Sequence, residues 1–189
     1  HSQGVIFNSL RHNLFKKKMA HIKSDFSVKT AKKRTGEVRR FRKSGGTVED
    51  VTSFSPAELS AIYQRLFDLR WQNSLKCTDT GILTETFTRF RDMIFGKVLF
   101  INDSHCAFDL NYKVECPSWY YFEDFNGGID PQFKSMGVGS VLLWENILTA
   151  KALAAPSDKK VIFSLGAYNP AWHYKKQWCD IMPSGRTLF

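Results

Sequence analysis

The chain has 189 residues, of which 43% are hydrophobic and 14% aromatic, enough for one domain with a hydrophobic core and too apolar for a disordered chain. Its net charge of +9 indicates an anionic partner. No apolar run approaches the roughly 18–20 residues of a membrane span, and no segment has the pattern of a signal peptide. The four cysteines form no C-x-x-C pair, so no metal is expected, and their scatter is typical of a reducing compartment.

The first predicted element is a basic helix over residues 27–44, followed by the helix-stopping pair Gly45-Gly46. Between residues 11 and 43 only Asp25 and Glu37 oppose a dense series of lysines and arginines. We call this segment the basic arm. It either binds an anion, such as an acidic lipid headgroup, tRNA or another polyanion, or is a solvated helix face. The residues expected to contact the anion are Lys32, Lys33, Arg34, Arg39, Arg40, Arg42 and Lys43.

Two further helices are predicted after a short strand over residues 47–54. Ser55, Pro56 and Glu58 have the pattern of a capping box with proline at the first helical position, so a helix should begin there and run to about residue 75. Phenylalanines recur at helical spacing over residues 84–95, which predicts the second helix.

The middle of the chain changes from helical to alternating periodicity. Residues 97–102, 105–115 and 119–125 are predicted as three consecutive antiparallel strands. A glycine-containing loop, a helix over 138–152, a strand over 160–165 and a short helix over 172–178 follow. This order predicts an α/β (α+β mixed-sheet) domain with a central, mostly antiparallel sheet flanked by helices.

Several segments together resemble the GNAT-type acyltransferases of the FemAB and CelD-like branch. They are KKRTGEVRRFRKSGG, YQRLFDLRW, YYFEDFN, GVGSVLLWENI and GAYNPAWHYKKQW. In that branch a small-Gly-Ser turn opens the central helix, and Gly139-Ser140 matches it. The branch also closes on a Gly, Tyr-Lys and Trp motif, which is matched here by Gly166, Tyr174, Lys175 and Trp178.

A closer resemblance is to the macrophage-induced proteins of Gram-negative bacteria that confer resistance to cationic antimicrobial peptides. Those proteins are longer than this chain, which resembles their C-terminal part. The resemblance implies a GNAT-like acyl-CoA N-acyltransferase domain over residues 27–182. Residues 1–26 are then an N-terminal extension or a fragment of a preceding region, and residues 183–189 are a C-terminal tail.

The resemblance also implies a donor-binding loop before the central helix. The GNAT pattern of Gln or Arg, two residues, Gly, one residue and Gly or Ala is met by Lys134-x-x-Gly137-x-Gly139. Bare backbone N–H groups at a helix N-terminus hold a pyrophosphate. The alternative is a structural turn that only starts a helix. Expected cofactor-binding residues are Lys134, Gly137, Val138, Gly139 and Ser140, and the expected donor is acyl-CoA or aminoacyl-tRNA.

Catalytic candidates flank this loop. Glu123 and Asp124 lie on the strand before it, where a base would sit, and Tyr174 lies beyond the following strand and could donate a proton. A hydrogen-bonded structural role is the alternative for both carboxylates. The sequence has no Ser-His-Asp order, G-x-S-x-G, H-E-x-x-H or G-x-x-x-x-G-K motif, which excludes those hydrolase, zinc-protease and P-loop classes.

Two functions therefore remain open. One is an acyl- or aminoacyltransferase acting on an amine or hydroxyl of a peptide or envelope component, linked to resistance to cationic antimicrobial peptides. The other is a catalytically inactive GNAT-fold protein, including one with a regulatory role, that binds an anionic membrane or nucleic acid through the basic arm. Whether the chain is an enzyme is open. A cytoplasmic location is expected, with peripheral attachment to the inner membrane as one option.

Overall fold

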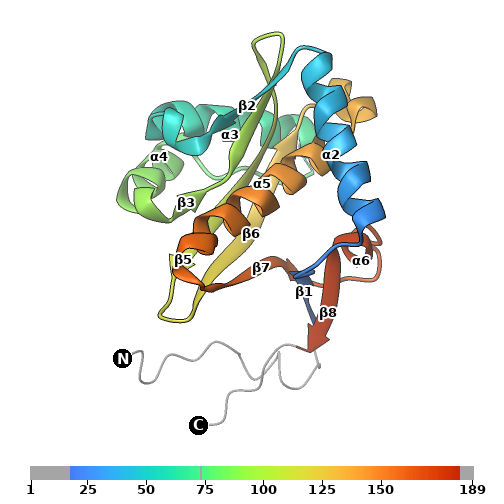
Figure 1. Cartoon of the computed structure of the whole chain (residues 1–189). Coiled ribbons are helices and arrows are strands. Elements are labelled where there is room, and N and C mark those ends of the chain that lie inside the picture. The colour runs from blue at the N-terminus through green and yellow to red at the C-terminus, as the bar shows by residue number, and fades with distance from the viewer. Residues whose placement is uncertain (1–17, 73, 184–189) are drawn as a thin grey trace.

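The computed structural model describes residues 18–72 and 74–183 (Figure 1). Within them an eight-stranded sheet has the order β2-β4-β5-β6-β7-β1-β8, with β3 paired to β5. Every pairing is antiparallel except β6 with β7, which confirms the predicted mixed, mostly antiparallel sheet. The strands are β1 Lys18–Ile22, β2 Gly46–Asp50, β3 Ile94–Phe95, β4 Lys97–Ile101, β5 Ser104–Glu115, β6 Trp119–Ile129, β7 Lys160–Ala167 and β8 Cys179–Pro183.

Helices cover both faces of the sheet. Helices α2 (Val28–Lys43) and α5 (Val138–Ala154) pack on one face, whereas α3 (Pro56–Trp71) and α4 (Thr80–Arg89) pack on the other (Figure 1). The strand alternation divides the core accordingly: Leu99 belongs to the α2–α5 cluster and Val98 to the α3–α4 cluster. Shorter helices complete the chain, namely η1 Val51–Ser53, η2 Arg91–Met93, η3 Pro131–Met136, η4 Ala155–Ser157 and α6 Lys175–Trp178.

Local signals explain where the long helices begin. Ser55 accepts the N–H of Glu58, and the Glu58 carboxylate accepts the N–H of Ser55, so the predicted capping box starts α3. Ser27 caps α2 by accepting the N–H of Thr30 at 3.2 Å. Helix α4, however, ends at Arg89 and so begins and ends earlier than predicted.

Strands β1 and β8 were not foreseen in the sequence. They pair with each other over residues 18–22 and 179–183, and β1 also pairs with β7. Residues 18–22, assigned from sequence to an N-terminal extension, thus form part of the sheet. Most of that extension and the tail from residue 184 lie outside the described residues.

Helix α5 is the central helix of the fold. Among the described residues, Val138–Ser157 is long and apolar enough to cross a membrane, with a mean hydropathy of 1.2, which corrects the expectation that no apolar segment reaches that length. Half of that segment is buried inside the fold, and α5 packs against β4, β5, β6 and β7. Its apolar composition is that of a buried core helix.

Candidate active site

The two parallel strands diverge halfway along β6. They pair from Trp119 with Lys160 to Glu123 with Ser164, and the described residues beyond this point form no pairs between the two strands. On its other side β6 has a bulge, because Asp124 and Asn126 pair with consecutive β5 residues while Phe125 between them stays unpaired. A bulge bends its strand and re-aims nearby side chains. The unpaired ends of β6 and β7 therefore leave a space between the two strands.

Two adjoining cavities fill this divergence, and both are lined by Arg70, Asp124, Leu165 and Tyr174. The first, of about 320 Å³, extends to the start of α5, and we call it the α5 cavity. The second, of about 480 Å³, extends along Glu123 and is called the Glu123 cavity. Both volumes are in the usual range for small-molecule sites.

The structure brings the sequence-predicted catalytic residues to this common place. Glu123, Asp124 and Tyr174 all line the Glu123 cavity, and Asp124 and Tyr174 also line the α5 cavity. Glu123 accepts a hydrogen bond from the Tyr121 hydroxyl. Tyr174 is half-exposed, and burial together with the negative charge of Asp124 raises the pKa of its hydroxyl. Their catalytic roles stay a prediction.

Asp109 on β5 is a site residue that the sequence did not reveal. It lines the α5 cavity beside Asp124 and lies opposite Gly127 in the β5–β6 register. A Cβ atom at Gly127 would be 1.8 Å from Asp109 Oδ1, so the missing side chain of Gly127 makes room for this carboxyl. The carboxyl groups of Asp109 and Asp124 therefore line the same cavity.

This carboxyl pair is held in an environment that favours the proton-bound form. Burial, and next the charge of Asp109, raise the pKa of Asp124 to about 8, and burial raises the pKa of Asp109 to about 6. Arg70 lowers both pKa values in part, and its guanidinium is fixed by donating to Gly127 O at 2.8 Å. Asp124 Oδ1 is buried and has no hydrogen-bond partner among the described residues. Asp124 is thus suited to take and release a proton near neutral pH.

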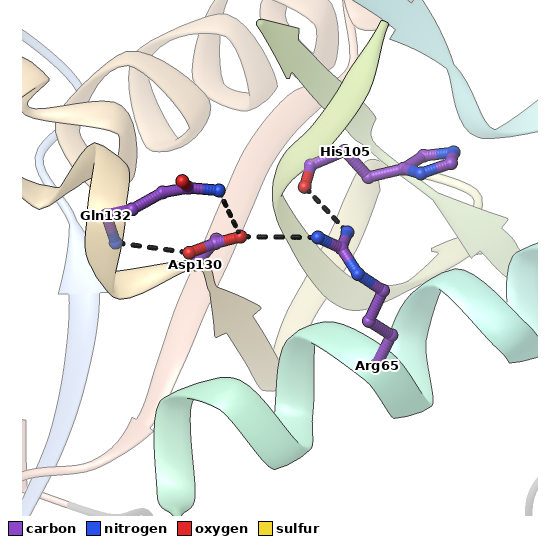
Figure 2. Close-up of polar contacts among 4 residues, drawn as sticks. All are labelled: Arg65, His105, Asp130 and Gln132. Atoms are coloured by element: carbon purple, nitrogen blue, oxygen red, sulfur yellow. Dashed lines mark hydrogen bonds and ion pairs between the residues drawn. The ribbon is translucent and has the colours of Figure 1, made fainter.

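The loop between β6 and α5 is anchored by Asp130, as Figure 2 shows. The Asp130 carboxylate accepts from the Gln132 backbone N–H at 3.1 Å and from the Gln132 side chain at 2.9 Å. It also pairs with Arg65 of α3 at 3.3 Å, and Arg65 donates to His105 O at 3.0 Å. This network ties the loop to α3 and β5 and caps the start of η3.

The predicted donor loop divides into parts with different roles. Gly139 and Ser140 line the α5 cavity, Lys134 is exposed on η3, and the Val138 side chain is buried in the core. Gly137 has a φ of 68°, which makes it the left-handed residue of the turn. Among the described residues the Val138 and Gly139 N–H groups have no hydrogen-bond acceptor, whereas the next N–H, of Ser140, donates to Gly137 O.

Arg34 corrects the prediction that it is an exposed residue of the basic arm. It is 8% exposed, because residues 34, 38 and 41 form the buried stripe of α2. Its guanidinium pairs with Glu37 at 2.9 Å, lies 4.2 Å from the centre of the Trp178 ring and donates to Ser140 Oγ at 3.4 Å. The other six arm residues are exposed as predicted, and anion binding by them stays a prediction: Lys32, Lys33, Arg39, Arg40, Arg42 and Lys43.

The closing motif holds the last helix to the sheet. Lys175 is 4% exposed and donates from Nζ to the carbonyl oxygens of Leu165 and Ala167 at the end of β7. Trp178 is buried beside the α5 cavity. Among the described residues no group of three or more His, Cys, Asp or Glu is placed to hold a metal ion.

Solved structures with the same fold include acetyltransferases. An aminoglycoside acetyltransferase from an uncultured soil metagenomic sample, in complex with sisomicin, aligns with a TM-score of 0.51 and 14% identity over 71% of this chain and 85% of its own. A "possible acetyltransferase" from Clostridium difficile 630 aligns with a TM-score of 0.50 and 10% identity over 76% and 98%. At these identities the likeness shows the fold alone.

A further solved structure covers more of the chain. The C-terminal domain of a "Putative Lysylphosphatidylglycerol Synthetase" from Agrobacterium fabrum aligns with a TM-score of 0.58 and 14% identity over 88% of this chain. The chain spans 58% of that domain's length. The predicted GNAT-like fold is thereby confirmed.

The family assignment comes from the sequence as a whole. No curated protein sequence matches the chain. The Mig-14 family model, by contrast, matches residues 3–187, almost the whole sequence, in agreement with the resemblance noted above. The chain therefore belongs to the Mig-14 family of macrophage-induced proteins linked to antimicrobial peptide resistance, and it has the GNAT fold.

Proposed function

We propose that this protein transfers an acyl or aminoacyl group onto an amine or hydroxyl of a peptide or envelope component. The observation that carries the proposal is that Asp124 and Tyr174 line the same cavity beside the diverging strands β6 and β7, and that this cavity also reaches Gly139 and Ser140 at the start of α5. The base Asp124, the proton donor Tyr174 and the anion site at the start of α5 would then all face the same cavity. The acetyltransferases that share the fold support this class of reaction.

The residues around Gly139 fit an acyl-CoA or an aminoacyl-tRNA, either of which supplies an activated carbonyl carbon when bound. The Val138 and Gly139 N–H groups are available for a phosphate, and the helix dipole adds to their attraction. A Cβ atom at Gly137 would have no atom within 4 Å, so the space over this turn is open. Phe133 and Met136 pack against the core rather than line the α5 cavity.

The chain's own groups can move the protons that such a transfer requires. With its pKa raised to about 8, Asp124 in its ionised form would take a proton from the ammonium or hydroxyl group of the acceptor. The amine nitrogen or hydroxyl oxygen would then form a bond to the carbonyl carbon, and the thioester or ester bond to the donor would break. Tyr174 would give its hydroxyl proton to the leaving group, since it lines the same two cavities.

Gly139→Val should block donor binding and leave the fold intact. Gly139 has no positive φ, and a Cβ there would meet only the Cδ1 end of Ile129, at 3.0 Å. The valine methyls would fill the space beside the free N–H groups, so we expect at least a tenfold loss of affinity. Lys134→Ala, which removes one exposed point charge, should weaken binding only severalfold. Titration calorimetry with acyl-CoA and aminoacyl-tRNA measures both.

Gly36→Val is the matched control, because it adds the same side chain inside α2, which does not line the α5 cavity. A Cβ atom at Gly36 would meet only Arg40 Nη1, at the ordinary distance of 3.6 Å. This variant should retain donor binding. If the wild-type protein binds neither donor at millimolar concentration, or if Gly139→Val binds as well as wild type, the donor site is wrong.

Anion binding by the basic arm is the second candidate function. The exposed cations of α2 favour it, because they form one charged helix face with a single ion pair, Arg42 with Glu145 at 3.3 Å, among the described residues. In this function the protein would lie at the cytoplasmic face of the inner membrane or on tRNA. It requires no chemistry at Asp124.

Lys32→Glu/Lys33→Glu should weaken binding to acidic vesicles or tRNA at least tenfold. Wild-type affinity should also fall steeply with added salt, because each neutralised phosphate releases counterions. The control pair Lys76→Glu/Arg89→Glu makes the same charge change at exposed positions away from α2. Equal losses in the two pairs, or no wild-type binding at low salt, would rule out an arm-specific site.

A further inference from the structure

A third cavity lies at the opposite end of the β6–β7 pair from the active site. Its volume is about 530 Å³, and it is lined by the end of β1, the C-terminal half of α5, η4 and the start of β7. It shares no lining residue with the α5 or Glu123 cavities. We call it the β1–β7 cavity. Neither the proposed transfer nor the exposed cations of α2 use it.

The cavity exists because β1 leaves the edge of β7 early. The paired residues are Met19 with Ala167 and His21 with Ser164, with an irregularity between them. The start of β7, from Lys160 to Phe163, therefore has β6 as its strand partner on one side and no described strand on the other. Helix α5 closes the bottom of this gap in the sheet.

The interior of the cavity is apolar. Ile147 and Phe163, each 2% exposed, and Ala154, 3% exposed, form part of its wall from α5 and β7. Ile22 of β1 and Val161 of β7 add partly buried apolar surface. Such a lining can remove a hydrocarbon chain from water.

The rim is positively charged. Four lysines line the cavity against the single acid Asp158, and they are Lys23, Lys151, Lys159 and Lys160. Lys159 pairs with Glu115, and Lys151 donates to Ser24 O. Lys23 and Lys160 form no ion pair with the described residues and are free to meet an anion.

We propose that the β1–β7 cavity binds a single-chain amphiphile with an anionic head. An apolar interior under a cationic rim complements a hydrocarbon chain that ends in a carboxylate or phosphate, and the volume is that of a small-molecule site. A free fatty acid and an acidic lysophospholipid share this chemistry. Binding here is independent of acyl transfer.

Titration calorimetry below the micelle concentration tests the proposal with saturated fatty acids of increasing length. We expect one saturable site per chain and an affinity that rises about three- to fourfold per methylene until the cavity is full. Lysophosphatidylglycerol tests the phospholipid source. Two controls test the charge of the head group: lysophosphatidylcholine is compared with lysophosphatidylglycerol, and dodecyltrimethylammonium with the fatty acid. If either control binds as tightly as its anionic counterpart, the proposal is overturned.

Variants locate the site. Lys23→Glu/Lys160→Glu should weaken fatty-acid binding at least tenfold, whereas Lys32→Glu/Lys33→Glu on α2, with the same charge change, should leave it unaltered. Ala154→Phe, checked for folding by a thermal melt, should weaken it by filling the cavity. Gly139→Val should have no effect. No saturable wild-type binding, or equal losses in the two lysine pairs, overturns the proposal.

Discussion

Asp124→Asn should lose acyl or aminoacyl transfer by roughly 10²–10⁴-fold, the contribution typical of a positioned general base. The amide has nearly the shape of the carboxyl group but cannot take the proton of the acceptor. Donor binding should stay within a fewfold of wild type, because the α5 N–H groups are untouched. Release of CoA thiol or of deacylated tRNA in the presence of an amine acceptor measures the loss. Transfer at the wild-type rate would remove Asp124 from the mechanism.

The same variant should change how stability depends on pH. In the folded protein Asp124 keeps its proton up to a pKa of about 8, whereas the unfolded chain releases it near the ordinary value of 3.8. Between these values the folded state binds the additional proton, so raising the pH lowers the free energy of unfolding. The stabilisation is complete below about pH 4 and is lost as the pH rises through about 8. The amide of the Asp124→Asn variant cannot titrate. The decrease in the free energy of unfolding between about pH 4 and pH 8 that is due to Asp124 should therefore disappear.

Urea melts from about pH 4 to about pH 9 measure this difference. Relative to wild type, Asp124→Asn should become more stable with rising pH, by on the order of a few kcal/mol at the alkaline end of that range. Asp109→Asn removes the neighbouring charge that helps raise the pKa of Asp124. In this variant the decrease in the free energy of unfolding with rising pH should therefore stop at a lower pH than in wild type. Parallel pH profiles for wild type and Asp124→Asn would contradict the buried, proton-bound carboxyl.

Local patterns in the sequence predicted the elements whose causes are local. The capping box of Ser55 and Glu58 and the alternation before the α5 loop each depend on residues a few positions apart, so α3 and the central strands were foreseen. Strands β1 and β8 are short and gain their partners from distant parts of the chain. Nothing in residues 18–22 alone indicates that pairing.

The candidate site also contains residues that local sequence patterns predict and residues that only the tertiary structure reveals. Glu123 and Asp124 could be selected because they precede a glycine loop, but Asp109 looks like any polar residue on an alternating strand. Only the register that sets it opposite Gly127 places it in the divergence. Arg34 differs, because its spacing from Val38 and Phe41 already marks the buried stripe of α2 and could have separated it from the exposed arm.

Gly128→Ala should destabilise the protein by about 3 kcal/mol, because a single added methyl group has no space. A Cβ atom there would lie 2.3 Å from the backbone carbon of Leu66 and 2.6 Å from its carbonyl oxygen. A backbone obstacle cannot rotate away as a side chain can, so α3 must move off β6. Helix α3 carries Arg70, whose guanidinium donates to Gly127 O. The rate of acyl or aminoacyl transfer should therefore fall together with the stability.

Gly36→Ala separates this effect from a general response to replacing glycine. Gly36 lies inside α2, where the added Cβ would meet only Arg40 Nη1, at the ordinary distance of 3.6 Å. Alanine is the better helix former, so this variant should gain about 0.5–1 kcal/mol. Urea melts of the two variants should therefore move in opposite directions from wild type. Gly128→Ala with wild-type stability would mean that α3 does not touch the β6 backbone, and the position of Arg70 at the carboxyl pair would lose its support.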